Sequence, residues 1–364
     1  MQINPPDPVH QTALFAMIII SSILVTLKLS YNDSLFSLRV TNQLKGLAIL
    51  TIVFSHIGYF LSNDTRFLFP MTILAGVGVN IFLFLSGFGL TTSALNRHLS
   101  PLEFYKKRLG KIFVPLWIII SLFFLLDFFI LQKSYPIVTI VQNYFGFYPR
   151  ANLYLDLDSP LWYFTLILFY YLIFPFLFRK KPIFLTPALM LLITYIVLFL
   201  PLPVDYGVLG LYKLHTLAFP AGVALAQIFE NQIFKNWWNK FKHFFQNKDS
   251  LKIILKFFSS AVLLWIIYYT AIHSGVGKGS STEQFWSMIT TFSIISVFLI
   301  SRFDSKVFAI FGLYSYEIYL FHWPLLYRYD LIYKILPAYL ATIVYLILFI
   351  ILGYLIQKLL KKII

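Results

Sequence analysis

The stretch LKGLAILTIVFSHIG, residues 44–58, is the most informative part of this chain, because it is an apolar segment that carries two ionisable side chains. Lys45 opens the segment, and His56 lies inside it, eleven residues later. Eleven steps of about 100° nearly complete three helical turns, so both side chains share one face, about 16 Å apart. Ionisable groups inside a bilayer are costly and usually functional. We therefore expect the rest of the chain to form a scaffold around His56.

The composition is that of a polytopic membrane protein. Of 364 residues, 59% are hydrophobic, 20% aromatic and only 12% charged, whereas soluble domains carry about 25% charged residues. The net charge of +15 would suit nucleic acid, but the cationic residues cluster in short loops between apolar runs. We therefore expect a lipid bilayer and no nucleic acid as partner. The absence of cysteine excludes disulfides, thiolate nucleophiles and cysteine-based metal sites, and we expect no metal.

The apolar runs predict an all-α transmembrane bundle of about eleven spans. The predicted spans are 12–29, 44–61, 71–93, 111–131, 161–178, 182–201, 209–228, 251–273, 285–301, 307–327 and 336–359. Most lysines and arginines fall in the loops after the odd-numbered spans and at the C-terminus, which predicts that this side is cytoplasmic. The N-terminus is then outside and the C-terminus inside.

Two connecting loops are long. Residues 132–160, on the outer side, mix Arg150, Asp156 and other polar residues with aromatic ones, which suits a cap that touches a polar substrate. Residues 229–250, on the inner side, contain NWWNKFKHFFQNK, a pattern typical of a helix that lies on the membrane surface. A solvated linker with interface anchors would explain the same pattern.

Small and basic residues mark the third and fourth spans. Ser86 and Gly87 lie in the middle of IFLFLSGFGL, where they permit close helix packing or the approach of a ligand chain; packing is the simpler interpretation. Lys107, Arg108 and Lys111 precede the fourth span on the cytoplasmic side, and the last two share a helix face. Such a cluster suits phosphate groups, although anchoring by the positive-inside rule explains most residues of this kind.

The stretch GLYSYEIYLFHWP, residues 312–324, places two more ionisable groups inside a span. Glu317 lies near the bilayer centre, where an unpaired carboxylate would be costly. It lies at a depth similar to that of His56 and would orient or charge-balance it if the two spans touch. Tyr319 and His322 share another helix face, about 140° from Glu317.

Taken together, these motifs resemble those of acyltransferase family 3, the bacterial membrane O-acyltransferases that modify surface carbohydrates. The matching stretches stand in the family's order: LKGLAILTIVFSH, FLFLSGF, YKKRLGKIFVPLW, YSYEIYLFHWP and, more weakly, LWYFTLILFYYLIFP. The family usually has ten spans that begin with the one carrying the histidine. The resemblance therefore implies an acyltransferase domain over residues 44–364 and an N-terminal segment, residues 1–43, with one extra helix.

The resemblance also implies an activity and site residues. It implies transfer of an acyl group, most often acetyl, from cytoplasmic acyl-CoA to a hydroxyl of a cell-surface carbohydrate or glycolipid, in the bacterial plasma (inner) membrane. His56 would be the general base and Glu317 its support. The donor would meet Lys45, Ser86, Gly87, Lys107, Arg108 and Lys111, and the acceptor would meet Trp162, Tyr316, Tyr319 and His322. Lys45 and Lys111 stand where the family has arginines, which keeps the charge and loses the bidentate fork.

Two other classes of protein would use similar residues. A transporter or flippase of a lipid-linked glycan would place them along a path, but the sequence has no transporter-like inverted repeat. A glycosyltransferase that uses a lipid-phosphate sugar would be expected to carry acidic residues in an early outer loop. The first outer loop, residues 62–70, contains only Asp64.

Overall fold

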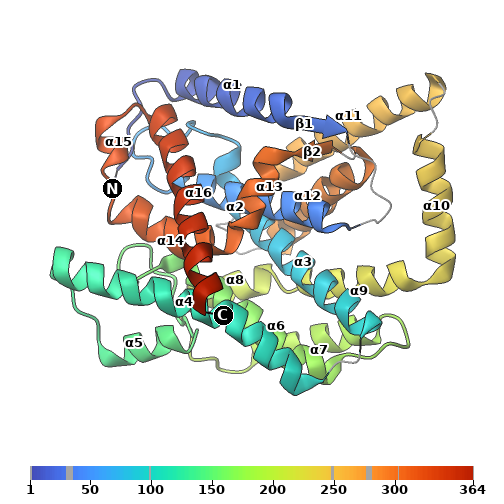
Figure 1. Cartoon of the computed structure of the whole chain (residues 1–364), viewed down its shortest axis with the longest axis horizontal. Coiled ribbons are helices and arrows are strands. Elements are labelled where there is room, and N and C mark those ends of the chain that lie inside the picture. Colours follow the sequence, from blue (N-terminus) through green and yellow to red (C-terminus); the bar gives the residue numbers. More distant parts are fainter. Residues whose placement is uncertain are drawn as a thin grey trace.

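The computed structural model describes residues 2–29, 36–97, 100–246, 250–275, 281–301 and 303–363 as a bundle of helices (Figure 1). The first half comprises α1 (Pro8–Thr26), β1 (Leu27–Leu29), α2 (Leu38–Gly58), η1 (Met71–Ile73), α3 (Ala75–Asn96), α4 (Pro101–Leu131), α5 (Ile137–Tyr144), η2 (Ser159–Leu161) and α6 (Trp162–Leu177). The second half comprises α7 (Leu185–Phe199), α8 (Tyr206–Leu214), α9 (Ala218–Glu230), α10 (Gln232–Gln246), α11 (Ser250–His273), α12 (Ser281–Ser301), β2 (Phe303–Ser305), α13 (Lys306–Leu313), α14 (Ser315–Tyr327), α15 (Ile332–Ile335) and α16 (Ala338–Ile363).

The predicted all-α membrane bundle is confirmed. Each of the predicted spans overlaps one helix or two consecutive helices, although the last three residues of the span 12–29 form β1 and not helix. In the described part of the chain, seven helical segments are long and apolar enough to cross a bilayer, and two more apolar helices are shorter. The crossing of all eleven stays a prediction.

Helix α2 lies at the centre of the bundle, between α3 and α13 (Figure 1). Nearly every residue from Leu44 to Ile57 is buried. The close approach to α13 depends on two glycines: a Cβ on Gly46 would lie 1.8 Å from the Phe308 carbonyl oxygen, and one on Gly312 would lie 1.7 Å from that of Asn42. The helix that carries Lys45 and His56 is therefore held by direct backbone contact.

Helices α3 and α9 approach each other in the same way. A Cβ on Gly87 would lie 2.3 Å from the Phe219 carbonyl oxygen, and one on Gly222 would lie 2.1 Å from that of Phe84. Small residues at a helix interface let the two backbones come this close. Gly89, two residues along the same helix, has nothing within 4 Å of its Cβ position.

We expect Gly87→Ala to lower the free energy of unfolding by about 1–3 kcal/mol, because the added methyl group meets backbone that must shift. Gly89→Ala is the matched control, and the higher helix propensity of alanine should leave that variant as stable as the wild type or more so. Unfolding of both variants in a detergent titration measures the difference. Equal stabilities would show that the α3–α9 contact tolerates a side chain at Gly87.

Two of the predicted continuous spans, 209–228 and 307–327, are broken in the structure. The first is divided at His215–Leu217 into α8 and α9, and the second at Tyr314 into α13 and α14. The break before α9 is tolerated because side chains bind the freed carbonyls: Tyr170 donates to the Thr216 oxygen at 3.1 Å, and Gln284 donates to the Lys213 oxygen at 3.1 Å. Internal partners of this kind permit irregular backbone at membrane depth.

Two short strands, which the sequence did not predict, join the first helix to the core. β1 pairs antiparallel with β2, with Leu27 opposite Ser305. The side chain of Gln43 accepts a hydrogen bond from the backbone of Ser305 at 2.8 Å, so the pair is also fastened to α2. Arg39, at the start of α2, forms an ion pair with Asp304 of β2.

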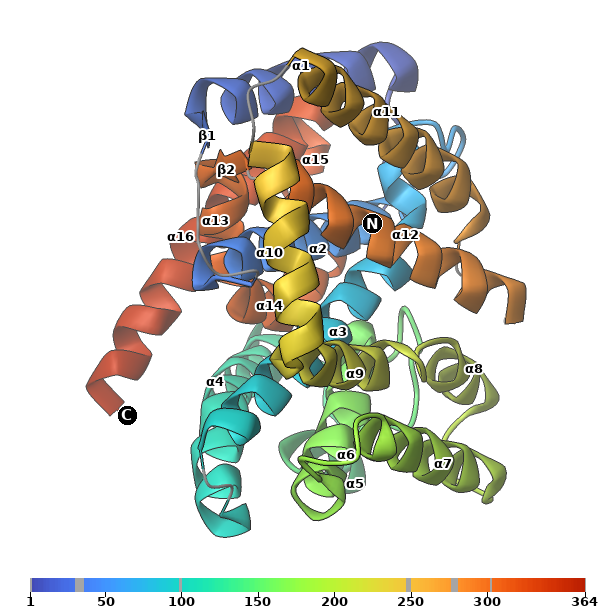
Figure 2. The ribbon, with the colours of Figure 1, turned by 90° about the vertical axis from the view of Figure 1, so that its right-hand side faces the viewer.

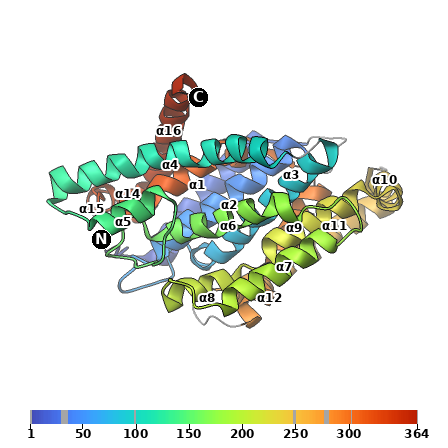
Figure 3. The same cartoon turned by 90° about the horizontal axis from the view of Figure 1, so that it is seen from below.

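Two further helices differ in how they lie against the bundle. The predicted amphipathic stretch forms a helix, α10, which stands on the outside of the bundle (Figure 2); residues 247–249 of this loop lie outside the described part. α4 extends along one side of the molecule (Figure 3). The membrane-surface position of α10 stays a prediction.

Candidate functional site

His56 and His322 lie directly against each other, although 266 residues separate them in the chain. His56 Nδ1 is 2.6 Å from His322 Nε2, the ring planes differ by 7°, and the ring centroids are 4.9 Å apart. Face-to-face rings would keep their nitrogens about 3.5 Å apart or more. The two imidazoles therefore lie edge to edge in nearly one plane, joined by a short hydrogen bond.

Hydrogen bonds to the backbone decide which nitrogens carry protons. His322 Nδ1 lies 2.9 Å from the Ile318 carbonyl oxygen and 3.0 Å from that of Tyr319. Carbonyl oxygens only accept, so Nδ1 carries the hydrogen, and Nε2 of the neutral ring is an acceptor. The short contact then requires His56 Nδ1 to donate. His56 is left with a free lone pair on Nε2, the form that a general base needs.

His56 lines a cavity of about 180 Å³. Its walls come from α2, α3, the outer loop, η2, α6, α8 and α14. The polar and aromatic side chains that line it beside His56 include Tyr59, Phe82, Ser159, Trp162, His215, Tyr319 and Trp323. A concave cavity lined mainly by apolar and aromatic side chains with a few polar groups is the usual form of a small-molecule site.

Three of the predicted acceptor-side residues surround this base. Trp162 and Tyr319 line the cavity, and the Tyr319 hydroxyl donates to the Pro160 carbonyl oxygen at 2.8 Å, which holds the outer loop in place. His322 lies behind His56 and supports it. The structure thus places His322 beside His56, where the sequence analysis expected the carboxylate of Glu317.

Glu317 is positioned on another side of α14. Its Oε2 accepts a hydrogen bond from Gln357 Nε2 of α16 at 3.2 Å. This direction agrees with the predicted angle between Glu317 and His322 along one helix. The hydrogen-bond partner that the structure gives His56 is His322, so a catalytic role of Glu317 stays a prediction.

Tyr316, also expected on the acceptor side, lies against another helix. Its hydroxyl donates to the Ile112 carbonyl oxygen of α4 at 2.5 Å. That contact joins α14 to α4. Of the two small residues of α3, Gly87 packs against α9, as the simpler interpretation held, and Ser86 Oγ lies 3.4 Å from the Tyr171 hydroxyl.

The predicted phosphate-binding residues form a second concave site. A groove of about 260 Å³ lies between the C-terminal part of α3 and the start of α4. Its cationic lining residues are Arg97, Lys107, Arg108 and Lys111. Lys107 is also 3.8 Å from Glu103, and an exposed ion pair of this kind contributes little to the stability of the fold. The Arg108 guanidinium lies 6.0 Å from the centre of the Tyr171 ring.

Lys45 belongs to the same charged region. It lies close enough to Arg108 for the two cations to repel each other. Because α2 is continuous from Leu38 to Gly58, Lys45 and His56 do share one helix face, as the eleven-residue spacing predicted. Arg39 is held by Asp304 and does not take the place of Lys45.

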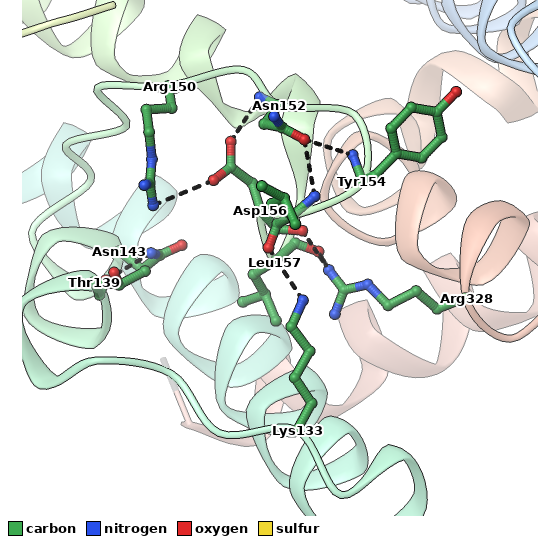
Figure 4. Close-up of polar contacts among 10 residues, drawn as sticks. Lys133, Thr139, Asn143, Arg150, Asn152, Tyr154, Asp156, Leu157 and Arg328 are labelled. Carbon is green, nitrogen blue, oxygen red and sulfur yellow. Dashed lines mark hydrogen bonds and ion pairs between the residues drawn. The ribbon is translucent and has the colours of Figure 1, made fainter.

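The polar residues of the outer loop bind mainly to one another (Figure 4). Asp156 accepts a hydrogen bond from the Asn152 backbone at 2.7 Å and lies 3.5 Å from Arg150, while Arg328 donates to the Asp156 carbonyl oxygen at 2.7 Å. Burial raises the pKa of the Asp156 carboxyl, and the Asn152 N–H opposes that shift. These residues shape the cap, whereas other residues of the same loop line the cavity: Ala151, Leu153, Ser159 and Pro160.

An unpredicted ion pair anchors this cap. Asp127 of α4 is fully buried and pairs with Arg328, whose side chain is 5% exposed. The Tyr329 hydroxyl also donates to Asp127, at 2.6 Å. Asp127 interrupts the apolar run of its helix, and that signal could have revealed the pair from sequence.

A further residue that the sequence did not predict is His215, which lines the His56 cavity from the break between α8 and α9. Its ring lies 5.5 Å from that of Trp162, at 20°. The only available signal was a histidine inside an apolar run.

In the described residues, no group of three or more His, Cys, Asp or Glu side chains could hold a metal ion.

Residues 41–358 match the model of a known protein family, described as an acyltransferase domain. The match covers α2 to α16, including both histidines of the pair and the basic groove. No curated protein sequence matches the chain.

Proposed function

Because the chain belongs to this family of membrane acyltransferases, we propose that it moves an acyl group, most simply acetyl, from acyl-CoA to a hydroxyl of a cell-surface carbohydrate or glycolipid. The observation that carries the proposal is the His56–His322 pair, which leaves an unprotonated imidazole nitrogen at a cavity. Loss of a proton from a hydroxyl is the step that such a nitrogen can catalyse.

The basic groove supports acyl-CoA as the donor. Arg97, Lys107, Arg108 and Lys111 would meet its phosphates. α3 lines both sites, with Phe82 at the cavity and Leu90 at the groove, eight residues and about 12 Å apart. That separation suits an extended pantetheine arm, with the thioester near His56 and the nucleotide at the groove.

The chemistry then follows from the two imidazoles. His56 Nε2 takes the hydroxyl proton as the acceptor oxygen attacks the thioester carbonyl carbon. His322 Nε2, which accepts from His56 Nδ1, stabilises the imidazolium that forms. When the carbon–sulfur bond breaks, the imidazolium returns the proton to the leaving thiolate. Trp323 lines the same cavity, and its buried Nε1–H has no hydrogen-bond partner in the described part of the chain, so we propose it as a donor to the developing oxyanion.

The proposed orientation follows from the charge distribution. With the basic groove in the cytoplasm, the donor enters from the side where acyl-CoA is made, and the cavity beneath the cap faces outwards towards the glycan. The protein then resides in the bacterial plasma membrane. The acceptor-side residues Trp162 and Tyr319 suit a sugar ring, because aromatic faces offer apolar contact and a polar tip.

Transfer of radiolabelled acetyl from acetyl-CoA into envelope glycan tests this function. The gene for this protein is deleted in the source cells, which then receive a plasmid that encodes the wild type or an empty vector. Membranes prepared from both strains are assayed. We expect label in glycan only with the wild type. Movement of glycan across the membrane without label would support the transporter interpretation and contradict the proposal.

We expect Arg108→Gln to raise the KM for acetyl-CoA about tenfold, because one charge-assisted phosphate contact is lost. The matched control is Lys106→Gln, which changes an exposed neighbour that does not line the groove. Initial rates over a range of acetyl-CoA concentrations give both values. An unchanged KM in Arg108→Gln at low salt would show that the donor phosphates bind elsewhere.

A further inference from the structure

His215 belongs to a chain of hydrogen bonds that fixes its protonation. The Ser287 hydroxyl donates to the Gln284 carbonyl oxygen at 3.0 Å, so its oxygen is free to accept. Asn80 Nδ2 donates to that oxygen at 3.1 Å, which leaves Asn80 Oδ1 as an acceptor. His215 Nδ1 lies 2.7 Å from Asn80 Oδ1 and therefore carries the hydrogen. His215 Nε2 is then a bare acceptor.

That acceptor has no hydrogen-bond partner among the residues that the structure describes. His215 is 1% exposed, and its Nε2 is buried without a hydrogen bond to the described residues. Buried polar atoms are nearly always paired, so an orphan in a native site calls for an explanation. Because His215 lines the same cavity as His56, the simplest partner is a donor on a molecule that binds there.

The two imidazoles of the cavity, those of His56 and His215, differ in the group that accepts the hydrogen bond from Nδ1–H. His56 donates to a second imidazole, which stabilises the positive charge that a base acquires. His215 donates to a neutral amide, which holds the ring in place and stabilises such a charge much less. His56 is thus suited to take a proton, and His215 is suited to accept a hydrogen bond without taking one.

We propose that His215 Nε2 binds a second hydroxyl group of the acceptor, one that is not acylated, and so selects polyhydroxylated acceptors. This inference rests on the proposed function. A molecule that fills both acceptor nitrogens presents two hydrogen-bond donors, as neighbouring hydroxyls of a sugar do. Trp162, whose ring lies nearly parallel to that of His215, adds an aromatic wall for the apolar face of such a ring.

The test measures two rates and one KM for each variant, with [1-14C]acetyl-CoA as donor. The rates are those of transfer to the envelope glycan and of acetyl-CoA hydrolysis by the purified enzyme, and the KM is that for acetyl-CoA in the hydrolysis. His215→Phe keeps a flat ring against Trp162 and loses the acceptor nitrogen. His215→Gln keeps an amide N–H for Asn80 and an oxygen for the cavity. The matched control, His273→Phe, makes the same change at a histidine that does not line the cavity.

We expect His215→Phe to lower glycan transfer about 10–100-fold and to leave hydrolysis and the KM for acetyl-CoA nearly unchanged, because water needs no second hydrogen bond. His215→Gln should recover part of the transfer. The double variant His215→Phe/Asn80→Leu removes the amide oxygen that the single variant orphans, and it should fold normally and still transfer poorly.

The outcomes separate the two proposals. If wild-type label is present and His215→Phe transfers normally, the role of His215 is overturned and the proposed function stands. A parallel loss of transfer and hydrolysis, restored by Asn80→Leu, would assign His215 to packing alone and overturn the inference as well. Absence of label with the wild type would overturn the proposed function itself.

Discussion

Replacement of His56 by alanine is expected to lower kcat for acyl transfer by about 10²–10⁴-fold, the usual contribution of a positioned general base. Folding should be preserved, because the lost ring faces a cavity on one side and a single hydrogen-bond partner on the other. The initial rate of label transfer into glycan measures the loss, and thermal unfolding in detergent provides the control. Full activity in a folded His56→Ala protein would remove His56 from the chemistry.

The same assay decides which group supports His56. We expect His322→Leu to be nearly as damaging as His56→Ala, because it removes the acceptor for His56 Nδ1–H. His322→Gln should retain part of the rate, since an amide can accept from His56 and donate to the backbone carbonyls. Glu317→Gln should stay close to the wild type, because an amide can still bond with Gln357. A severe loss in Glu317→Gln with an active His322→Gln would instead favour Glu317 as the support.

The second large effect is expected on stability. Arg328→Met should lower the free energy of unfolding by about 3–5 kcal/mol, because it leaves the fully buried Asp127 carboxylate without its cation. Detergent-induced unfolding followed by circular dichroism measures this change. In Arg328→Met/Asp127→Asn the unpaired charge is gone, so much of the stability should return.

Arg66→Met provides the control for this prediction. Arg66 pairs with Asp64 at 2.6 Å, but its side chain is 68% exposed, and exposed pairs contribute little. Its loss should therefore leave unfolding nearly unchanged. Equal stabilities of Arg328→Met and Arg66→Met would show that the Asp127 charge is neutralised in another way.

Periodicity and charge predicted much of this molecule, because they depend on local sequence. The run 44–61 identified the central helix, and the eleven-residue spacing correctly placed Lys45 and His56 on one face. Arg108 and Lys111 were expected at a shared basic surface, and both line the same groove. In each case one helix carries all the residues that the prediction needed.

Predictions that required two helices to meet could not be made in the same way. The helical angle showed that Glu317 and His322 point apart, but it could not show which of them faces α2, and the structure places His322 there. The break at His215 was also hidden, because the groups that bind its freed carbonyls, on Tyr170 and Gln284, lie far away in sequence. The sequence does show Asp127 as a charged residue inside an apolar run, but it does not show that Arg328 is its partner.

The antiparallel pairing of β1 with β2 also sets an order of events during synthesis. Leu29 leaves the ribosome long before its partner Phe303 has been made. At roughly 5–20 residues per second the delay is tens of seconds. The N-terminal end of the segment that carries α1 has its partner much sooner, because Ile3 donates a backbone hydrogen bond to the carbonyl oxygen of Phe60 at 2.6 Å, and Phe60 is made only 57 residues after Ile3. The first helix is therefore tethered at one end while translation continues, and it docks fully only after most of the protein has been inserted.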